Sequence, residues 1–145
     1  MDQLDDQPLG YLLYRVTTAL KPEITAELRP LGLTLPEFVC MRILSLSPGR
    51  SSADLARHTN VSPQAMNTVL RGLEDKRIVA RPATVSSGRS LPAELTREGL
   101  ALLRRAEAAV RIADGRVLAN LTAQQRREFR RILVALGSDE IDADA

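Results

Sequence analysis

VSPQAMNTVLRGLEDKRIVARP, residues 61–82, predicts an amphipathic helix that runs into a short β-leaning segment. Ser62 with Pro63 behind it is a typical helix start, because serine caps free backbone N–H groups and proline is tolerated in the first turn. One face carries apolar residues at i, i+3, i+4 and i+7 spacing: Met66, Val69, Leu70 and Leu73. The other carries short hydrogen-bonding groups and an arginine: Gln64, Asn67, Thr68 and Arg71.

The composition predicts one folded domain without a metal centre or a membrane segment. The chain has 145 residues, of which 44% are hydrophobic and 26% charged. No apolar run approaches the roughly 18 residues that span a bilayer, and the first residues are not basic, so we expect a cytoplasmic protein. Cys40 is the only cysteine and His58 the only histidine, which excludes a disulfide framework and predicts no metal and no cofactor.

Positive charge is concentrated around the quoted helix. Residues 50–97 hold eight Lys or Arg against four Asp or Glu, a local charge of +4, whereas the rest of the chain holds 12 and 14, a charge of −2. A local excess of this sign suits a polyanion. Random scatter of surface charge is the alternative, and charge alone does not separate the two.

Helices are predicted on both sides of the quoted one. Residues 9–28 show helical apolar spacing that Pro22 should kink or end. LTLPEFVCMRILSL, residues 33–46, begins with a capping box of Thr34 and Glu37, and a short helix follows near 52–58. The connection HTNV, residues 58–61, should then bury Val61 in the core.

Beyond Lys76 the apolar residues no longer follow helical spacing. Residues 77–83 and 91–95 are predicted as two strands joined by a Ser/Gly-rich tip, with Pro92 confined to an edge or partial pairing. Two helices should follow, at 96–119 and from a capping box at Thr122 to about residue 136, before an acidic and disordered tail at 138–145. The fold class is therefore mainly α with a small β wing. A single domain, 1–137, contains a winged helix-turn-helix at about 33–96 between dimerisation helices at about 8–30 and 97–137.

The polar face of the quoted helix fits the major groove of duplex DNA, which admits one α-helix. Gln and Asn pair with adenine, Arg pairs with guanine, and Thr reaches base edges or a thymine methyl group. These residue types lie near the N-terminal turns where a recognition helix reads, so Ser62 and Pro63 should also approach the DNA. A plain solvated face is the alternative, because Gln, Asn and Thr are common on surfaces.

Two further DNA contacts are predicted outside that helix. Arg89 at the tip of the wing is placed to enter a minor groove, although it is also explained as a solvated loop arginine. Ser51 and Ser52 at a helix start are able to bind a phosphate, and ordinary helix capping is compatible with that role.

The ordered series of motifs closely resembles the MarR family of winged helix-turn-helix regulators over residues 8–137. It comprises LTLPEFVCMRIL, SADLARHTNVSPQAMNTVLRGLEDKRIVAR, the wing with Arg89, LTREG and LTAQQRREFRRIL. The resemblance implies a homodimer with interlocked terminal helices and recognition helices spaced for a palindromic operator. It also implies that a small aromatic ligand, or oxidation, lowers the affinity for DNA.

Three departures from the family pattern lie in or beside the wing. Ser87 precedes Gly88 and Arg89 where the family has Asp-x-Arg, Arg77 replaces a glycine, and Pro92 interrupts the second wing strand. The wing should therefore depart from the family geometry more than the recognition helix does.

Four other residues have candidate roles. Cys40, in an apolar run, is predicted to be a buried packing residue, whereas relatives that sense peroxide carry their cysteine in the first helix. Tyr11, Tyr14 and Arg15 are the candidate lining of an aromatic-ligand pocket, with half-buried packing as the alternative for the tyrosines.

The sequence thus predicts a homodimeric, sequence-specific transcriptional repressor that binds double-stranded DNA and a phenolic effector. A phosphate-binding glycine loop, a metal cluster and a nucleophile–base pair are all missing from the sequence, so an enzyme is not expected. The alternative function is a winged-helix protein–protein interaction module that does not read DNA sequence. Only a DNA binder should lose affinity for random duplex steeply as salt rises.

Overall fold

The computed structural model describes residues 6–81 and 92–137. In chain order its elements are α1 (Leu9–Leu28), the 3-10 turn η1 (Arg29–Leu31), α2 (Leu35–Leu46), α3 (Ser52–Thr59), α4 (Pro63–Asp75), β1 (Val79–Ala80), β2 (Glu94–Leu95), α5 (Arg97–Val117) and α6 (Ala123–Leu136). This order confirms the predicted mainly α winged helix-turn-helix with helices at both ends. None of the helices in the described residues is long and apolar enough to cross a membrane.

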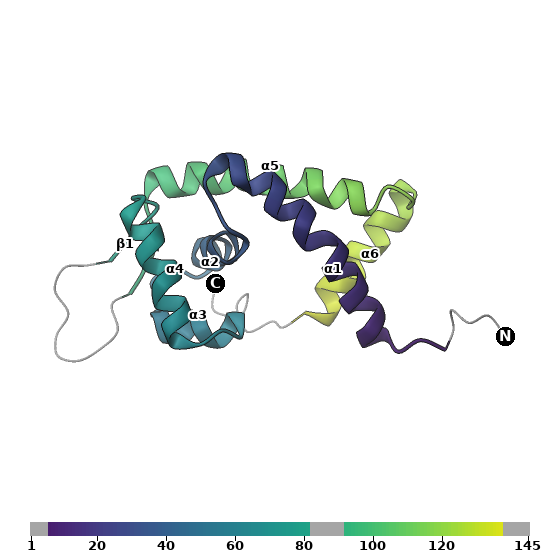
Figure 1. Cartoon of the computed structure of the whole chain (residues 1–145), viewed down its shortest axis with the longest axis horizontal. Helices are drawn as coiled ribbons and strands as arrows, with labels where there is room; N and C mark the ends of the chain where they lie inside the picture. Colours follow the sequence, from purple (N-terminus) through teal and green to yellow (C-terminus); the bar gives the residue numbers. More distant parts are fainter. Residues whose placement is uncertain (1–5, 82–91, 138–145) are drawn as a thin grey trace.

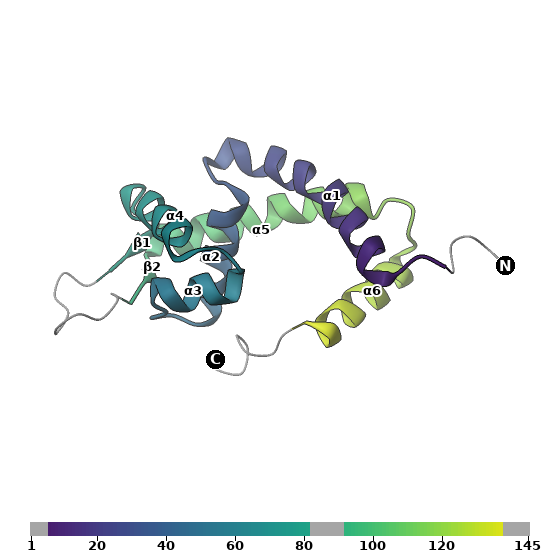
Figure 2. The same cartoon turned by 60° about the horizontal axis from the view of Figure 1, so that its bottom comes forward.

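The elements gather at two ends of an elongated molecule. α2, α3, α4 and the two strands lie at one end, and α6 lies at the other (Figures 1 and 2). α5 runs between the two ends, and α1 packs along it. Exposed ion pairs also link these two helices: Arg116 Nη1 lies 2.6 Å from Glu27 Oε1 and 3.3 Å from Glu23 Oε2.

One cluster of buried side chains joins α1 to the winged part. It includes Leu28 of α1, Met41 of α2, Leu55 of α3, Leu70 of α4 and Leu103 of α5. Burial of this apolar surface is the main force that holds the helices together. None of the residues of α6 is buried, and among the described residues no element fully covers its apolar face.

Cys40 lies within this core and is fully buried, as the sequence predicts. Burial raises the pKa of its thiol to about 12. Because the thiolate is the reactive form, a protonated thiol without solvent contact is suited to packing rather than to redox sensing.

Three predicted helix starts are confirmed. The Thr34 hydroxyl accepts a hydrogen bond from the Glu37 N–H at 3.2 Å, and the Glu37 carboxylate accepts one from the Thr34 N–H at 3.0 Å. The same reciprocal pair links Thr122 and Gln125, and Ser62 Oγ accepts from the Ala65 N–H. Each start satisfies backbone N–H groups that a helix leaves unpaired.

Pro22 does not end α1, which continues to Leu28. A proline removes one backbone hydrogen bond and crowds the preceding turn, but tertiary burial can offset that cost. Ile24 and Leu28, both beyond the proline, are buried in the core.

Val61 is not buried in the core, contrary to the expectation from HTNV. Its exposed fraction is 39%, and it lines a shallow hollow between α3 and the start of α4. The preceding Asn60 has a left-handed backbone, with φ of 55°, and ends α3. The chain reverses at this residue, and Val61 then lies at the protein surface.

The wing strands are present, and within residues 77–81 and 92–95, the described part of the predicted 77–83 and 91–95, they are shorter than expected. β1 and β2 pair antiparallel, with Val79 opposite Leu95 and Ala80 opposite Glu94. Ala93 pairs instead with Arg50 in the loop before α3, an arrangement that the sequence does not predict. Ser87, Gly88 and Arg89 lie outside the described residues.

Candidate nucleic-acid interface

α4 separates its apolar and polar residues as the sequence predicts. Met66, Leu70 and Leu73 are buried, and Val69 packs partly against the same core. The opposite face is solvent-accessible, with Asn67 half-buried and three residues exposed: Gln64, Thr68 and Arg71. The structure thus brings all four predicted base-contacting side chains to one face of one helix.

The start of α4 carries free hydrogen-bonding capacity on that face. Ser62 Oγ accepts the Ala65 N–H at 3.1 Å, and Pro63 occupies the first helical position, where a missing N–H costs least. Both residues are exposed. The Thr68 hydroxyl donates to the Gln64 carbonyl at 3.1 Å, which orients its methyl group and leaves its oxygen able to accept.

The start of α3 is a second polar site. Ser51 Oγ accepts from the Asp54 N–H at 3.2 Å, and the Asp54 carboxylate accepts from the Ser51 N–H at 3.4 Å and pairs with Arg57. Desolvation alone would raise the pKa of Asp54, but hydrogen bonds from Ser51 and the nearby Arg57 outweigh it and hold that pKa below its ordinary value. Ser51 and Ser52 are half-buried, so the predicted serines form a helix start in which capping is observed.

Two cations near the helix-turn-helix were not among the predicted contacts. Arg57 on α3 has a side chain that is 74% exposed, beside the start of α4. Arg50 contacts His58 Nε2 at 3.1 Å and donates to Ser47 Oγ at 3.1 Å, while its backbone pairs with Ala93 of the wing. Arg57 could have been found from the sequence, because it lies between the capping box at the start of the short helix and the turn that ends it. The pairing of Arg50 with the wing could not, because it has no local sequence signature.

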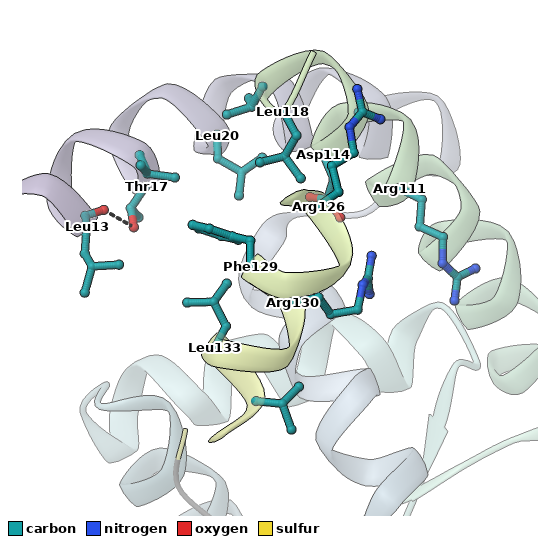
Figure 3. Close-up of a pocket in the computed structure, with 14 residues that line it drawn as sticks. Leu13, Thr17, Leu20, Arg111, Asp114, Leu118, Arg126, Phe129, Arg130 and Leu133 are labelled. Carbon is teal, nitrogen blue, oxygen red and sulfur yellow. Dashed lines mark hydrogen bonds between the residues drawn. The ribbon is translucent and has the colours of Figure 1, made fainter. Parts of the chain in front are cut away.

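A groove of about 450 Å³ lies between α1, α5 and α6. Figure 3 shows Phe129 of α6 directed toward Leu20 and Thr17 of α1, with Arg126 and Arg130 near Asp114 at the opposite side. Desolvation raises the pKa of Asp114, and Arg130 and Arg111 act in the opposite direction. The groove is therefore apolar at its centre and charged along one side.

The apolar surface around the groove is extensive. Exposed large hydrophobic residues lie along all three helices: Leu9, Tyr11, Leu13, Tyr14, Val16, Leu100, Ile112, Ile132, Leu133, Val134 and Leu136. Four of them, Leu13, Val16, Leu133 and Val134, line the groove itself. Exposed apolar side chains gathered at one place mark an interaction site rather than a solvated face.

The candidate ligand residues are not part of this groove. Tyr11 and Tyr14 are 52% and 67% exposed, Arg15 is exposed, and none of the three is among the residues that line it. They lie on the first half of α1, where neighbouring residues such as Leu13 and Val16 do line the groove. Among the described residues no cluster of His, Cys, Asp or Glu could hold a metal ion.

Comparison with known proteins gives consistent matches. A family model described as the MarR family matches residues 31–90. A transcriptional repressor of Mycobacterium tuberculosis, Rv2887, is 70% identical over 139 residues, which cover 96% of this chain and 100% of that protein.

Solved structures of that mycobacterial MarR family protein match as well. Its complex with DNA has a TM-score of 0.80 at 66% identity and covers 92% of this chain and 100% of the other. Its complex with salicylic acid has a TM-score of 0.78 at 71% identity, with 92% and 99% covered.

Proposed function

The chain belongs to the MarR family, and on that premise we propose that it is a sequence-specific DNA-binding transcriptional repressor that acts as a homodimer. Membership of a family of transcriptional regulators supports a regulatory rather than an enzymatic role. The 70%-identical relative is a repressor and binds DNA in its solved complex, which supports the same function here.

The observation that carries the proposal is the polar face of α4. Gln64, Asn67, Thr68 and Arg71 provide the hydrogen-bonding groups that read base edges, on a helix anchored by buried leucines and methionine. We assign base contacts to Asn67 and Arg71, and backbone or first-turn contacts to Ser51, Ser52, Ser62 and Pro63. Arg89 is proposed to enter the minor groove from the wing.

The homodimer is supported by the groove and the apolar surface around it. α6 has no buried residue, and Val134 and Leu136 are 70% and 74% exposed in the single chain. A second copy that inserts its own terminal helices would cover this surface on both chains at once, since a two-fold interface is self-complementary. The operator should then contain two half-sites related by the same symmetry.

A phenolic acid is the proposed effector. The relative has been solved with salicylic acid, whose carboxylate and ring suit a site with a cation and aromatic side chains. We propose Arg15 for the carboxylate and Tyr11 and Tyr14 for the ring, near the boundary with the partner subunit. The effector would relieve repression only by favouring a dimer whose α4 helices no longer match the groove spacing.

The experiment begins with a duplex that the wild-type protein selects from a random-sequence pool, called the selected duplex below. Its affinity is compared with that of a scrambled duplex over a salt series by fluorescence anisotropy. We expect a large preference for the selected duplex and a steep loss of affinity for both as salt rises. Equal affinity for the two duplexes, with little salt dependence, would favour an interaction module that does not read DNA.

A further inference from the structure

Glu37 is a nearly buried carboxylate that joins three elements. It is 6% exposed, and its Oε1 accepts a hydrogen bond from the Thr34 N–H at the start of α2. Lys76, the residue that ends α4, places its Nζ 2.9 Å from Glu37 Oε2 and 3.1 Å from Oε1. The same ammonium donates to the Gly32 carbonyl at 2.7 Å, in the turn between η1 and α2.

The carboxylate lies against the backbone of α4 itself. A Cβ added at Gly72 would lie 3.4 Å from Glu37 Oε2, so this glycine allows the close approach. The C-terminal end of a helix carries partial negative charge, which makes it an unfavourable place for a buried carboxylate. Lys76 supplies the compensating charge at that end.

Apolar packing alone does not specify the orientation of α4. Met66, Leu70 and Leu73 bury the helix against the core, but hydrophobic contacts are non-directional and leave room for small rolls and tilts. Three hydrogen bonds from one ammonium to fixed acceptors on α2 and its preceding turn have defined directions. They fix the C-terminal end of α4 relative to the rest of the winged part.

We propose that Glu37 and Lys76 are positioning residues for DNA recognition, which rests on the proposed function. Arg71 lies five residues before Lys76, about 7.5 Å along the helix axis at 1.5 Å per residue. A binding constellation becomes ineffective when its groups are displaced by about 1 Å. The Glu37–Lys76 pair therefore sets the angle at which Asn67 and Arg71 meet the bases, without contacting DNA.

The decisive variant is Glu37→Gln. The Gln side chain retains a carbonyl oxygen for the Thr34 N–H but loses the negative charge that pairs with Lys76. Removal of an acidic charge should by itself strengthen binding to a polyanion. The positioning role predicts the opposite result: affinity for the selected duplex falls about tenfold, equivalent to ~1.4 kcal/mol, while affinity for scrambled duplex stays within about threefold.

Two other variants complete the test. Asp75→Asn is the matched control, because it removes the same charge from an exposed residue one position from Lys76, and it should leave the preference for the selected duplex unchanged. Lys76→Met should lower that preference like Glu37→Gln, the double variant should lose no more than the worse single variant, and Lys76→Arg should restore most of it. All affinities are measured well below the melting temperature of each variant, so that unfolding does not contribute.

The outcomes separate the inference from the function on which it rests. Unchanged or tighter binding of Glu37→Gln to the selected duplex overturns the positioning role while the function stands. Equal losses on selected and scrambled duplexes also overturn it, since orientation would not be what the pair controls. A wild-type protein without preference between the duplexes refutes the proposed function, and the positioning role with it.

Discussion

Gly99→Ala should destabilise the fold although it places a better helix former in a helix. Gly99 lies in the first turn of α5, and a Cβ there would lie 2.1 Å from the Ile78 carbonyl oxygen and 3.0 Å from its carbon. Real Cβ atoms essentially never approach another atom closer than 3.0 Å, so α5 and the chain before β1 must separate by about 0.9 Å, the difference between 3.0 and 2.1 Å. Backbone lies on both sides of this contact, and neither side can turn away as a flexible side chain does.

The separation also strains hydrogen bonds at the helix start. The Ile78 carbonyl accepts from the Thr96 N–H at 2.9 Å and from the Thr96 hydroxyl at 3.2 Å. Overpacking costs about 1–3 kcal/mol, and each weakened hydrogen bond costs on the order of 1 kcal/mol. Helix propensity returns at most ~1 kcal/mol. The free energy of unfolding should fall by about 2–4 kcal/mol, which lowers the melting temperature by roughly 5–15 °C.

Circular dichroism melts and urea titrations at one protein concentration measure this effect. Gly10→Ala is the control, because it is a helical glycine with nothing within 4 Å of the added Cβ and does not line the groove. It should raise the free energy of unfolding by up to ~1 kcal/mol. A Gly99→Ala protein that melts at or above the wild-type temperature would show that the contact between Gly99 and Ile78 does not constrain the fold.

Asn67→Ala and Arg71→Ala should each cost about 1–3 kcal/mol on the selected duplex and relax preference at particular base pairs, whereas equal losses on scrambled duplex would exclude base reading. Arg77 has a left-handed backbone, with φ of 60°, so Arg77→Gly should raise the free energy of unfolding by about 0.5–1 kcal/mol after the entropy of glycine in the unfolded chain is counted. The urea midpoint should rise accordingly, and a lower midpoint would contradict this. Cys40 should make the free energy of unfolding fall at alkaline pH. The pKa of its thiol is about 12 in the folded protein against the ordinary 9.0, so its stabilisation is complete below pH 9.0 and is lost as pH rises further. Cys40→Ala should flatten the plot of unfolding free energy against pH in this range. A slope that is unchanged between pH 9 and 11, a range of about two units, would argue against this role of the Cys40 thiol. Static light scattering at micromolar concentration should give twice the 15.9 kDa chain mass, and a monomer would exclude the homodimer.

Local chemistry explains which parts of the fold the sequence predicts well. Thr34, Ser62 and Thr122 each cap a helix through a residue three positions away, and such contacts depend on short segments alone. The recognition face was predictable for the same reason, since α4 has one apolar stripe and one polar stripe. Pro22 shows the limit, because burial of the residues beyond it overrides a local preference.

Contacts between distant segments were not predictable from single residues. Lys76 meets Glu37 across 39 positions, and Arg50 pairs with Ala93 across the wing. In the sequence, Gly99 is only a residue of low helix propensity, and the structure is needed to show that Ile78 lies too close for a side chain there. The tyrosines of α1 are exposed in the single chain, and the proposed ligand site would need surface from a second subunit to enclose them.

α5 links the two ends of the molecule as one continuous helix of 21 residues, which is about 32 Å long at 1.5 Å per residue. Its start packs at Gly99 against Ile78, the residue before β1, and its last turn lines the groove through Asp114 and Val117. If α5 moves as a straight rod, a pivot of about 5° at the groove would displace its far end by roughly 3 Å. In the proposed symmetric dimer the displacement would occur twice, so a slight adjustment among the terminal helices would become a change of several ångströms between the two α4 helices. Rigid DNA, which fixes that separation, would in turn restrain the terminal helices through the same rod.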